Sequence, residues 1–319
     1  MILMLKKILF IFITSKFNTK INLSYLDLNF RKIDFTNHNK VKSFIFKKNF
    51  YTYKNKNIHS FDFLNFSNKL GGKIGINLSK KAIFEWHKLN KNKLGFPWIE
   101  DLSSKRLINL LYNYEYINSS SKEDDKKKLD FIIYFHIQRI LFDFNSKKIS
   151  EFTSYDLKAY LLSCSLLKKI NEKEIDYIKY IVDNQIDKIG MHKSYNFLEH
   201  SKFINNLSEI KNILLFSKSN KSNVFDEVIL KMTSILNEYF HLDGSLALFN
   251  GTNNIYSMNI YNSLNKESYL KKREFLNIDN GIAFYSDKNK KIFFDVVQPN
   301  SDMISSYLSA GTLSIELSG

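Results

Sequence analysis

The sequence predicts an α+β fold in which a series of amphipathic helices is followed by antiparallel strands. Between residues 79 and 250, apolar side chains recur at spacings of three and four, the period of a helix that is buried on one face. Between residues 281 and 297, two apolar runs flank the polar stretch 286–290, which predicts a β-hairpin. The 319 residues include only two prolines and ten glycines, too few for the many tight turns of an all-β fold.

The helical part begins, on this pattern, at Ser79, a capping residue that precedes the apolar positions Ile83 and Trp86. Further helices are predicted over residues 101–117, 123–144, 153–169, 171–186, 198–216 and 223–240. Short polar breaks separate them, which is typical of antiparallel neighbours. Serial helices of this kind build a bundle, a solenoid or a helical toroid.

The chain therefore divides into three expected parts. Residues 1–78 form a basic, irregular segment. Over residues 15–80 the periodicity is weak, which predicts loops, short strands and one short helix. Residues 79–262 form the helical domain, and residues 263–319 form the start of a β domain. The last ten residues alternate small or polar with apolar side chains, as a strand does. Either this strand completes a sheet with the hairpin, or the chain ends early within a larger domain; we expect an incomplete β domain.

The net charge of +15 is concentrated near the N-terminus, where residues 1–60 hold twelve basic residues against two aspartates. Such a surface attracts nucleic acid, acidic lipid or acidic polysaccharide without choosing among them. The Lys- and Asn-rich composition is also typical of an AT-rich genome, which reduces the functional meaning of the charge. Because no nucleic-acid motif or glycine-rich phosphate loop accompanies it, no nucleic-acid partner is expected.

Two further features bear on the compartment and on cofactors. Cys164, the single cysteine, lies in an apolar run and is expected to be a buried residue, so no disulfide, metal site or cofactor is predicted. Residues 1–14 combine lysines with apolar residues like a signal peptide, but no small-residue cleavage site follows. The run is too short and interrupted to span a bilayer, so no transmembrane span is expected, and an amphipathic surface helix is the alternative. The compartment stays open.

Several motifs carry a family resemblance, in this order along the chain: Phe63-Leu64-Asn65, Phe84-Glu85-Trp86, Trp98-Ile99-Glu100-Asp101, Asp243-Gly244-Ser245-Leu246-Ala247-Leu248-Phe249-Asn250-Gly251 and Ala310-Gly311-Thr312-Leu313-Ser314-Ile315-Glu316. From about residue 60 onward, the chain resembles the heparinase II/III-like polysaccharide lyases of the alphaproteobacterial type. The resemblance implies an incomplete helical (α/α) toroid followed by an antiparallel β-sandwich. It also implies β-elimination on an acidic, uronate-containing polysaccharide in the periplasm or cell envelope; the cytoplasm is the alternative. The rival hypothesis is a non-catalytic helical binding or scaffold protein.

Two departures from the family pattern concern the site. The family has a Gly-Gly-His-x-x-Arg-Asn-Pro stretch where residues 190–197 read Gly-Met-His-Lys-Ser-Tyr-Asn-Phe, so His192 and Asn196 match while the Arg and Pro do not. The family often places a His directly before the Ala-Gly-Thr-Leu-Ser strand, and here that position is Ser309. We therefore expect any activity of this chain to be impaired.

The resemblance assigns roles to four residues. A polysaccharide lyase removes the proton α to a uronate carboxylate, which requires a neutralising donor and a general base and acid. In this hypothesis Asn196 is a neutraliser, His192 is a base or a neutraliser, and Tyr256 or Tyr261 supplies the phenol. The alternative is that His192 and Asn196 are loop and capping groups between a helix that ends near Gly190 and the next helix. With 18 tyrosines in the chain, any one of them is more often structural.

Overall fold

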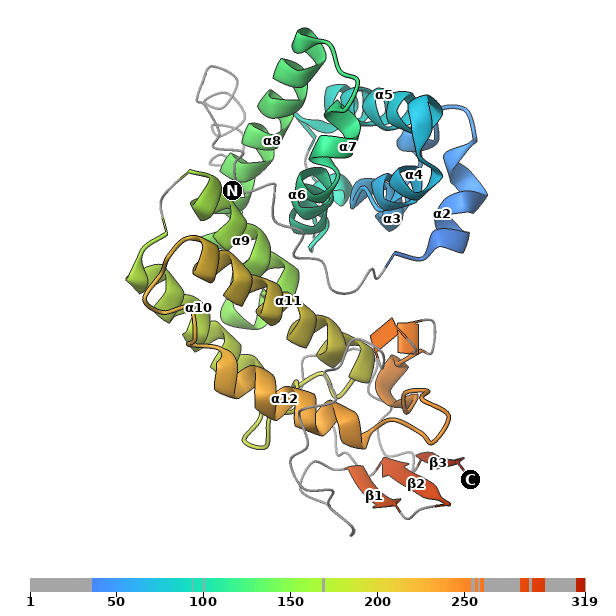
Figure 1. The fold of residues 1–319 in the computed structure, drawn as a ribbon, viewed down its shortest axis with the longest axis vertical. Coiled ribbons are helices and arrows are strands. Elements are labelled where there is room, and N and C mark those ends of the chain that lie inside the picture. Colours follow the sequence, from blue (N-terminus) through green and yellow to red (C-terminus); the bar gives the residue numbers. More distant parts are fainter. Residues whose placement is uncertain are drawn as a thin grey trace. The chain divides into compact units, whose positions relative to one another are not determined.

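The computed structural model describes residues 36–93, 95–99, 101–167, 170–253, 256–257, 259–260, 282–286, 289–295 and 314–318. These residues form helices and one small antiparallel sheet, an α+β fold (Figure 1). They fall into two compact units, described separately here: a first unit of Thr36–Lys147 with Tyr155–Ile170, and a second unit within Lys148–Ser154 and Asn171–Gly319. This division lies inside the expected 79–262 helical domain, whose boundaries stay a prediction.

Every described secondary-structure element of the first unit is a helix. Its elements are α2 (His38–Ile45), η2 (Phe50–Thr52), α3 (Lys56–His59), α4 (Phe63–Leu70), α5 (Gly72–Asn90), η3 (Phe96–Trp98), α6 (Leu102–Tyr112), α7 (Tyr114–Asn118), α8 (Glu123–Phe144) and most of α9 (Ser154–Leu166). Helix α6 packs against α8, and α4 packs against α5. The predicted 101–117 helix is broken at Asn113, and the predicted 123–144 helix is confirmed.

Residues 36–80 were expected to form loops, short strands and one short helix, and this prediction is wrong. Three helices, α2, α3 and α4, precede α5 in this region. Helices α2 and α3 begin with asparagine caps, since the side chains of Asn37 and Asn55 accept hydrogen bonds from backbone N–H groups of the first turn. Helices of four to eight residues span at most two turns. They are therefore too short for a periodic pattern to show.

Helix α5 begins at Gly72, and Ser79, which was expected to cap it, is buried in its middle. Gly71 separates α4 from α5 with a φ of 67°, a conformation that glycine adopts without strain. Gly75 lies where three helices meet. A Cβ atom there would stand 2.2 Å from the Tyr116 hydroxyl oxygen and 2.8 Å from the Ser67 carbonyl oxygen. Close packing therefore explains a glycine that helix propensity alone would disfavour.

Gly75→Ala should destabilise the protein. Alanine favours a helix by about 1 kcal/mol over glycine. However, the added methyl group would displace the Tyr116 hydroxyl from its 2.7 Å hydrogen bond to the Ser67 carbonyl. Overpacking of this kind costs roughly 1–3 kcal/mol, so a net loss in the urea-unfolding free energy is expected. Asn77→Ala, at an exposed position of the same helix, is the control and should be neutral or stabilising. A more stable G75A variant would contradict the packing.

The second unit contains η4 (Ile149–Glu151), α10 (Glu172–Gln185), α11 (Phe197–Phe216), α12 (Asp226–Glu238), η5 (Phe249–Gly251) and the sheet. Its three longer helices confirm the helices predicted over residues 171–186, 198–216 and 223–240. Asn171 caps α10 through a capping box with Glu174. Helices α11 and α12 pack against each other (Figure 1). The ring of Phe197 stacks on that of Tyr239 with centroids 4.4 Å apart, which joins the start of α11 to the end of α12.

The sheet consists of β1 (Ile282–Ser286), β2 (Lys291–Asp295) and β3 (Ser314–Ser318), in the order β1-β2-β3 and antiparallel throughout. The hairpin is confirmed, and the last strand pairs with it, as one of the two alternatives held. Phe284 and Phe293 point to the inner face and contact the ring of Tyr239. The outer face is apolar and open, with Ile315 57% and Leu317 68% exposed.

Candidate functional site

His192 and Asn196 lie in the turn between α10 and α11, so their spacing of four residues does not place them on one helical face. Helix α10 ends at Gln185, and a single bridge then pairs Ile186 with His192. Asp187 fixes the turn, because its Oδ1 accepts hydrogen bonds from three consecutive backbone N–H groups, at residues 189–191. The result is a tight turn that delivers residues 192–196 to the start of α11.

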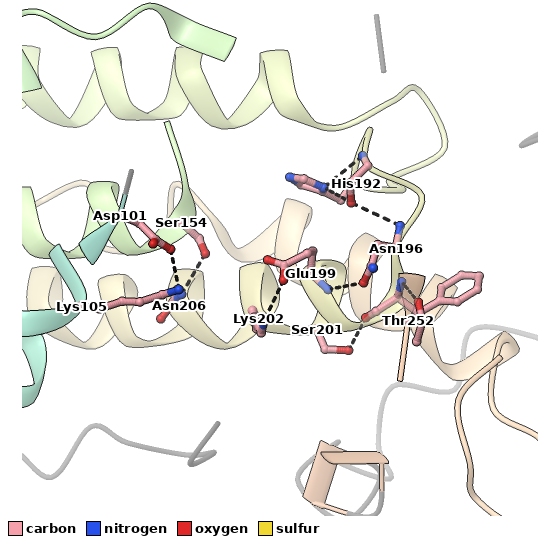
Figure 2. Close-up of polar contacts among 12 residues, drawn as sticks. Asp101, Lys105, Ser154, His192, Asn196, Glu199, Ser201, Lys202, Asn206 and Thr252 are labelled. Atoms are coloured by element: carbon pink, nitrogen blue, oxygen red, sulfur yellow. Dashed lines mark hydrogen bonds and ion pairs between the residues drawn. The ribbon is translucent and has the colours of Figure 1, made fainter. Parts of the chain in front are cut away.

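Asn196 is the N-cap of α11, which confirms the capping interpretation. Its Oδ1 accepts a hydrogen bond of 2.9 Å from the backbone N–H of Glu199. Its Nδ2 donates one of 2.8 Å to the carbonyl of Asn250. The next amide, that of Phe197, donates to Thr252 Oγ1 at 2.9 Å (Figure 2). Two segments more than fifty residues apart in the sequence thus meet at the first turn of α11.

His192 is a buried, neutral imidazole whose proton can be assigned. Its Nδ1 accepts from the backbone N–H of Ser194 at 3.2 Å and lies 2.8 Å from Ser194 Oγ. The neutral ring therefore carries its hydrogen on Nε2, which has no hydrogen-bond partner among the described residues. Burial lowers the pKa of His192 to about 4, and the Glu199 carboxylate offsets this only in part. His200 holds the backbone in place, since its Nδ1 accepts from the N–H of His192.

A third segment joins this region through Glu316 in β3. Its Oε1 accepts a hydrogen bond of 2.7 Å from the backbone N–H of Leu248, and its Oε2 lies 2.8 Å from His241 Nε2. The His241 ring also stands edge-on to Phe293 with centroids 4.9 Å apart. The carboxylate thus fastens the sheet to the turn that follows α12. That turn contains Gly244 with a φ of 80°, as its Asp-Gly sequence predicts.

Of the two tyrosines expected in the site, only Tyr256 is among the described residues. Tyr256 is half-buried and directly precedes Ser257, whose hydroxyl accepts from the N–H of Leu246 in the same turn. Tyr261 lies outside the described residues, as does Ser309. The residue after Tyr256 therefore contacts the 241–248 turn.

Two residues with left-handed backbone angles contact each other in this region. Tyr195 has a φ of 50° and Asn250 a φ of 53°, and the side chain of Asn250 donates to the carbonyl of Tyr195 at 3.2 Å. Asparagine tolerates this conformation, but a bulky tyrosine there is an outlier that the surrounding contacts must hold. Sequence reasoning did not find Tyr195, Thr252, His241 or the role of Glu316. Of these, Tyr195 lay within the 190–197 stretch and Glu316 at the end of the 310–316 motif, but neither was assigned a role.

Searches for relatives and for other kinds of site gave no match. No family model, curated protein or solved structure matches the chain. Within the described ranges, no group of three or more histidine, cysteine, aspartate or glutamate side chains is placed to hold a metal ion. In the same part of the chain, no helix combines the length and the apolar character that crossing a bilayer requires.

The stability of the protein should fall steeply with acid because several histidines are buried in the neutral form. Burial lowers the pKa of His59, His87 and His192 to about 4, that of His200 to about 3, and that of His136 well below 6.5. In the unfolded chain these groups take up protons near pH 6.5. The stabilisation is therefore complete above pH 6.5 and is lost as the pH falls toward 4. Each such histidine contributes a slope of roughly 1.4 kcal/mol per pH unit.

Urea unfolding at a series of pH values between 8 and 4.5 measures this slope. Asp62 and Asp187, whose pKa values burial raises, act in the opposite direction at low pH and flatten the curve there. A free energy of unfolding that is constant between pH 7 and pH 5 would contradict the burial of these histidines.

Proposed function

We propose that the chain is a heparinase II/III-like polysaccharide lyase homologue that acts by β-elimination on an acidic, uronate-containing polysaccharide. The proposal includes the finer architecture, an incomplete (α/α) toroid followed by the start of an antiparallel β-sandwich. The open apolar face of the sheet, with Ile315 and Leu317, fits the packing surface of such a sandwich.

The observation that carries the proposal is the meeting of three segments that were singled out by sequence. Residues 190–197 contact residues 250–252 through Asn196 and Phe197. Strand β3 contacts the 241–248 turn through Glu316. A functional site assembled from distant segments has this form, whereas motifs that serve only local structure have no need to meet.

His192 fits the role of a donor that neutralises the uronate carboxylate. Because Nδ1 is occupied by Ser194, the N–H on Nε2 is the group that can hydrogen bond to an acidic sugar. The pKa of about 4 makes the ring a weak base at neutral pH, which disfavours it as the proton acceptor. We assign the proton abstraction to a phenol, either Tyr256 or Tyr261, and a proton must also reach the oxygen of the departing 4-linked sugar.

One observation favours the rival, a non-catalytic binding or scaffold protein. Both polar atoms of the Asn196 side chain are engaged inside the protein, Oδ1 with Glu199 and Nδ2 with Asn250. In this arrangement Asn196 positions the neighbouring residues and does not itself neutralise a substrate. Only the lyase converts the polysaccharide to product, so an assay of product formation separates the two functions.

The test follows the ultraviolet absorbance of the unsaturated uronate product with heparan, alginate and other uronate polymers. We expect slow product formation above the enzyme-free rate. His192→Ala should reduce it by roughly 10²–10³-fold, the effect of losing one preorganised donor. Tyr256→Phe should reduce it by roughly 10²–10⁴-fold if Tyr256 is the general base. Tyr285→Phe, on the open face of the sheet, is the matched control and should leave the rate unchanged.

The other outcomes are also decisive. Binding of a polymer without product would establish the rival and refute the lyase assignment. If His192→Ala leaves the rate of product formation unchanged, His192 is not part of the site. Absence of both binding and product with every uronate polymer would overturn the proposal as a whole.

A further inference from the structure

The first unit contains a buried arginine, Arg106 in α6, whose side chain has no solvent exposure. Its guanidinium carbon lies 4.0 Å from the ring centroid of Trp86 and 4.4 Å from that of Trp98. The His136 ring closes the same space, with its centroid 5.4 Å from that of Trp98 and 6.0 Å from that of Trp86. We call these four residues the arginine cage.

Among the described residues, the acceptors of the Arg106 hydrogen bonds are all neutral. Nε donates to His136 Nε2 at 2.7 Å, and His136 is the neutral tautomer because its Nδ1 hydrogen bonds to the carbonyl of Ile132 at 2.8 Å. Nη1 donates to the carbonyls of His59 and Pro97. The two hydrogens of the buried Nη2 meet no acceptor in the described part of the chain.

A second buried polar side chain, His87, stands beside the cage. It is 8% exposed, and its ring centroid is 6.4 Å from that of His136. Neither of its ring nitrogens has a hydrogen-bond partner within the described ranges. A neutral imidazole always carries one N–H, so His87 adds a second unsatisfied donor beside the cage.

The described part of the chain also supplies no counter-charge to the cage. Within the described residues, no carboxylate contacts the Arg106 guanidinium, which stays charged in proteins. Burial lowers its pKa, and the neighbouring Arg139 guanidinium lowers it further, since like charges repel. Arg139 is itself paired with Asp143 at 2.9 Å. Buried charges are normally paired, and buried donors are normally satisfied, so this site calls for a negative acceptor.

We propose that a small monovalent anion of halide size binds in the arginine cage, between Arg106 Nη2 and the imidazole of His87. An anion accepts hydrogen bonds from both donors and also neutralises the excess positive charge. A water molecule could accept the hydrogen bonds but would leave the charge unneutralised. We choose an ion of this size because the rings of Trp86 and Trp98 already lie 4.0 Å and 4.4 Å from the guanidinium carbon. This inference is independent of the proposed lyase function.

The test measures the thermal unfolding midpoint of the full chain at constant ionic strength while chloride or bromide replaces gluconate, an anion too large for the cage. A specific site gives a saturable rise in the midpoint, because the anion binds only the folded protein. A general salt effect gives a rise that does not saturate.

Variants localise the effect. His87→Phe keeps a ring in contact with Phe135 and removes the donor, so it should weaken the apparent chloride affinity by about tenfold. Phe131→Leu is the matched control, since its ring also stands edge-on to His87 but offers no donor, and it should leave the affinity unchanged. Bromide-soaked crystals should show an anomalous peak within hydrogen-bond distance of Arg106 Nη2. A midpoint that does not depend on halide, an affinity unchanged in H87F, or a peak elsewhere would overturn the proposal.

Discussion

The carboxylate of Glu316 joins the small sheet to the helical part of the second unit. It lies at the centre of β3, far along the chain from the residues that it contacts. It accepts hydrogen bonds from the Leu248 amide at 2.7 Å and stands 2.8 Å from His241. Hydrogen bonds to a charged group contribute roughly 1.5–3 kcal/mol, more than neutral ones. The strands are also held by the inner aromatic side chains and by Lys291 in β2, whose Nζ donates to the carbonyls of Glu238 and Phe240.

The segment that follows the 241–248 turn carries Asn250 and Thr252, which bind the start of α11. Glu316 therefore acts on the His192 region through a chain of contacts: β3 fixes residues 241–248, and the segment that follows binds Asn196 and Phe197. The left-handed backbone of Tyr195 persists because these neighbours hold it. In the proposed lyase, these contacts would hold His192 in position, as a preorganised donor requires.

The sequence predicted the parts of the fold that depend on repeated local pattern. Helix α8 and helices α10 to α12 were found because each spans three or more turns with a regular apolar stripe. The short helices α2 to α4 were missed because helices of four to eight residues are too short to show an apolar stripe. The start of α5 was misplaced because its first turn contains two glycines, Gly72 and Gly75, which disfavour a helix. Gly75 is required by close packing against Tyr116, which cannot be read from the local sequence.

The site was predicted only in part. His192 and Asn196 were singled out by resemblance, but the partners that define their roles, Ser194, Asn250 and Thr252, depend on tertiary contacts. The cap at Asn196 was foreseeable from its position before a helix. Its second hydrogen bond, to a carbonyl far along the chain, was not. The arginine cage was equally hidden, since a lone arginine in an amphipathic helix is usually on the solvent side.

Residue-resolved hydrogen exchange of the Leu248 and Phe197 amides tests the central claim, that distant segments meet around α11 and β3. Among the described residues, the Leu248 amide donates only to Glu316, and the Phe197 amide, in the first turn of a helix, donates only to Thr252. First-turn amides are otherwise open to water. We predict that both amides are protected in the unaltered protein. Glu316→Ala should speed the exchange of Leu248 by at least about tenfold, and Leu317→Thr, on the outer face of the same strand, should not. Exchange of both amides at the unstructured rate in the unaltered protein would contradict the account.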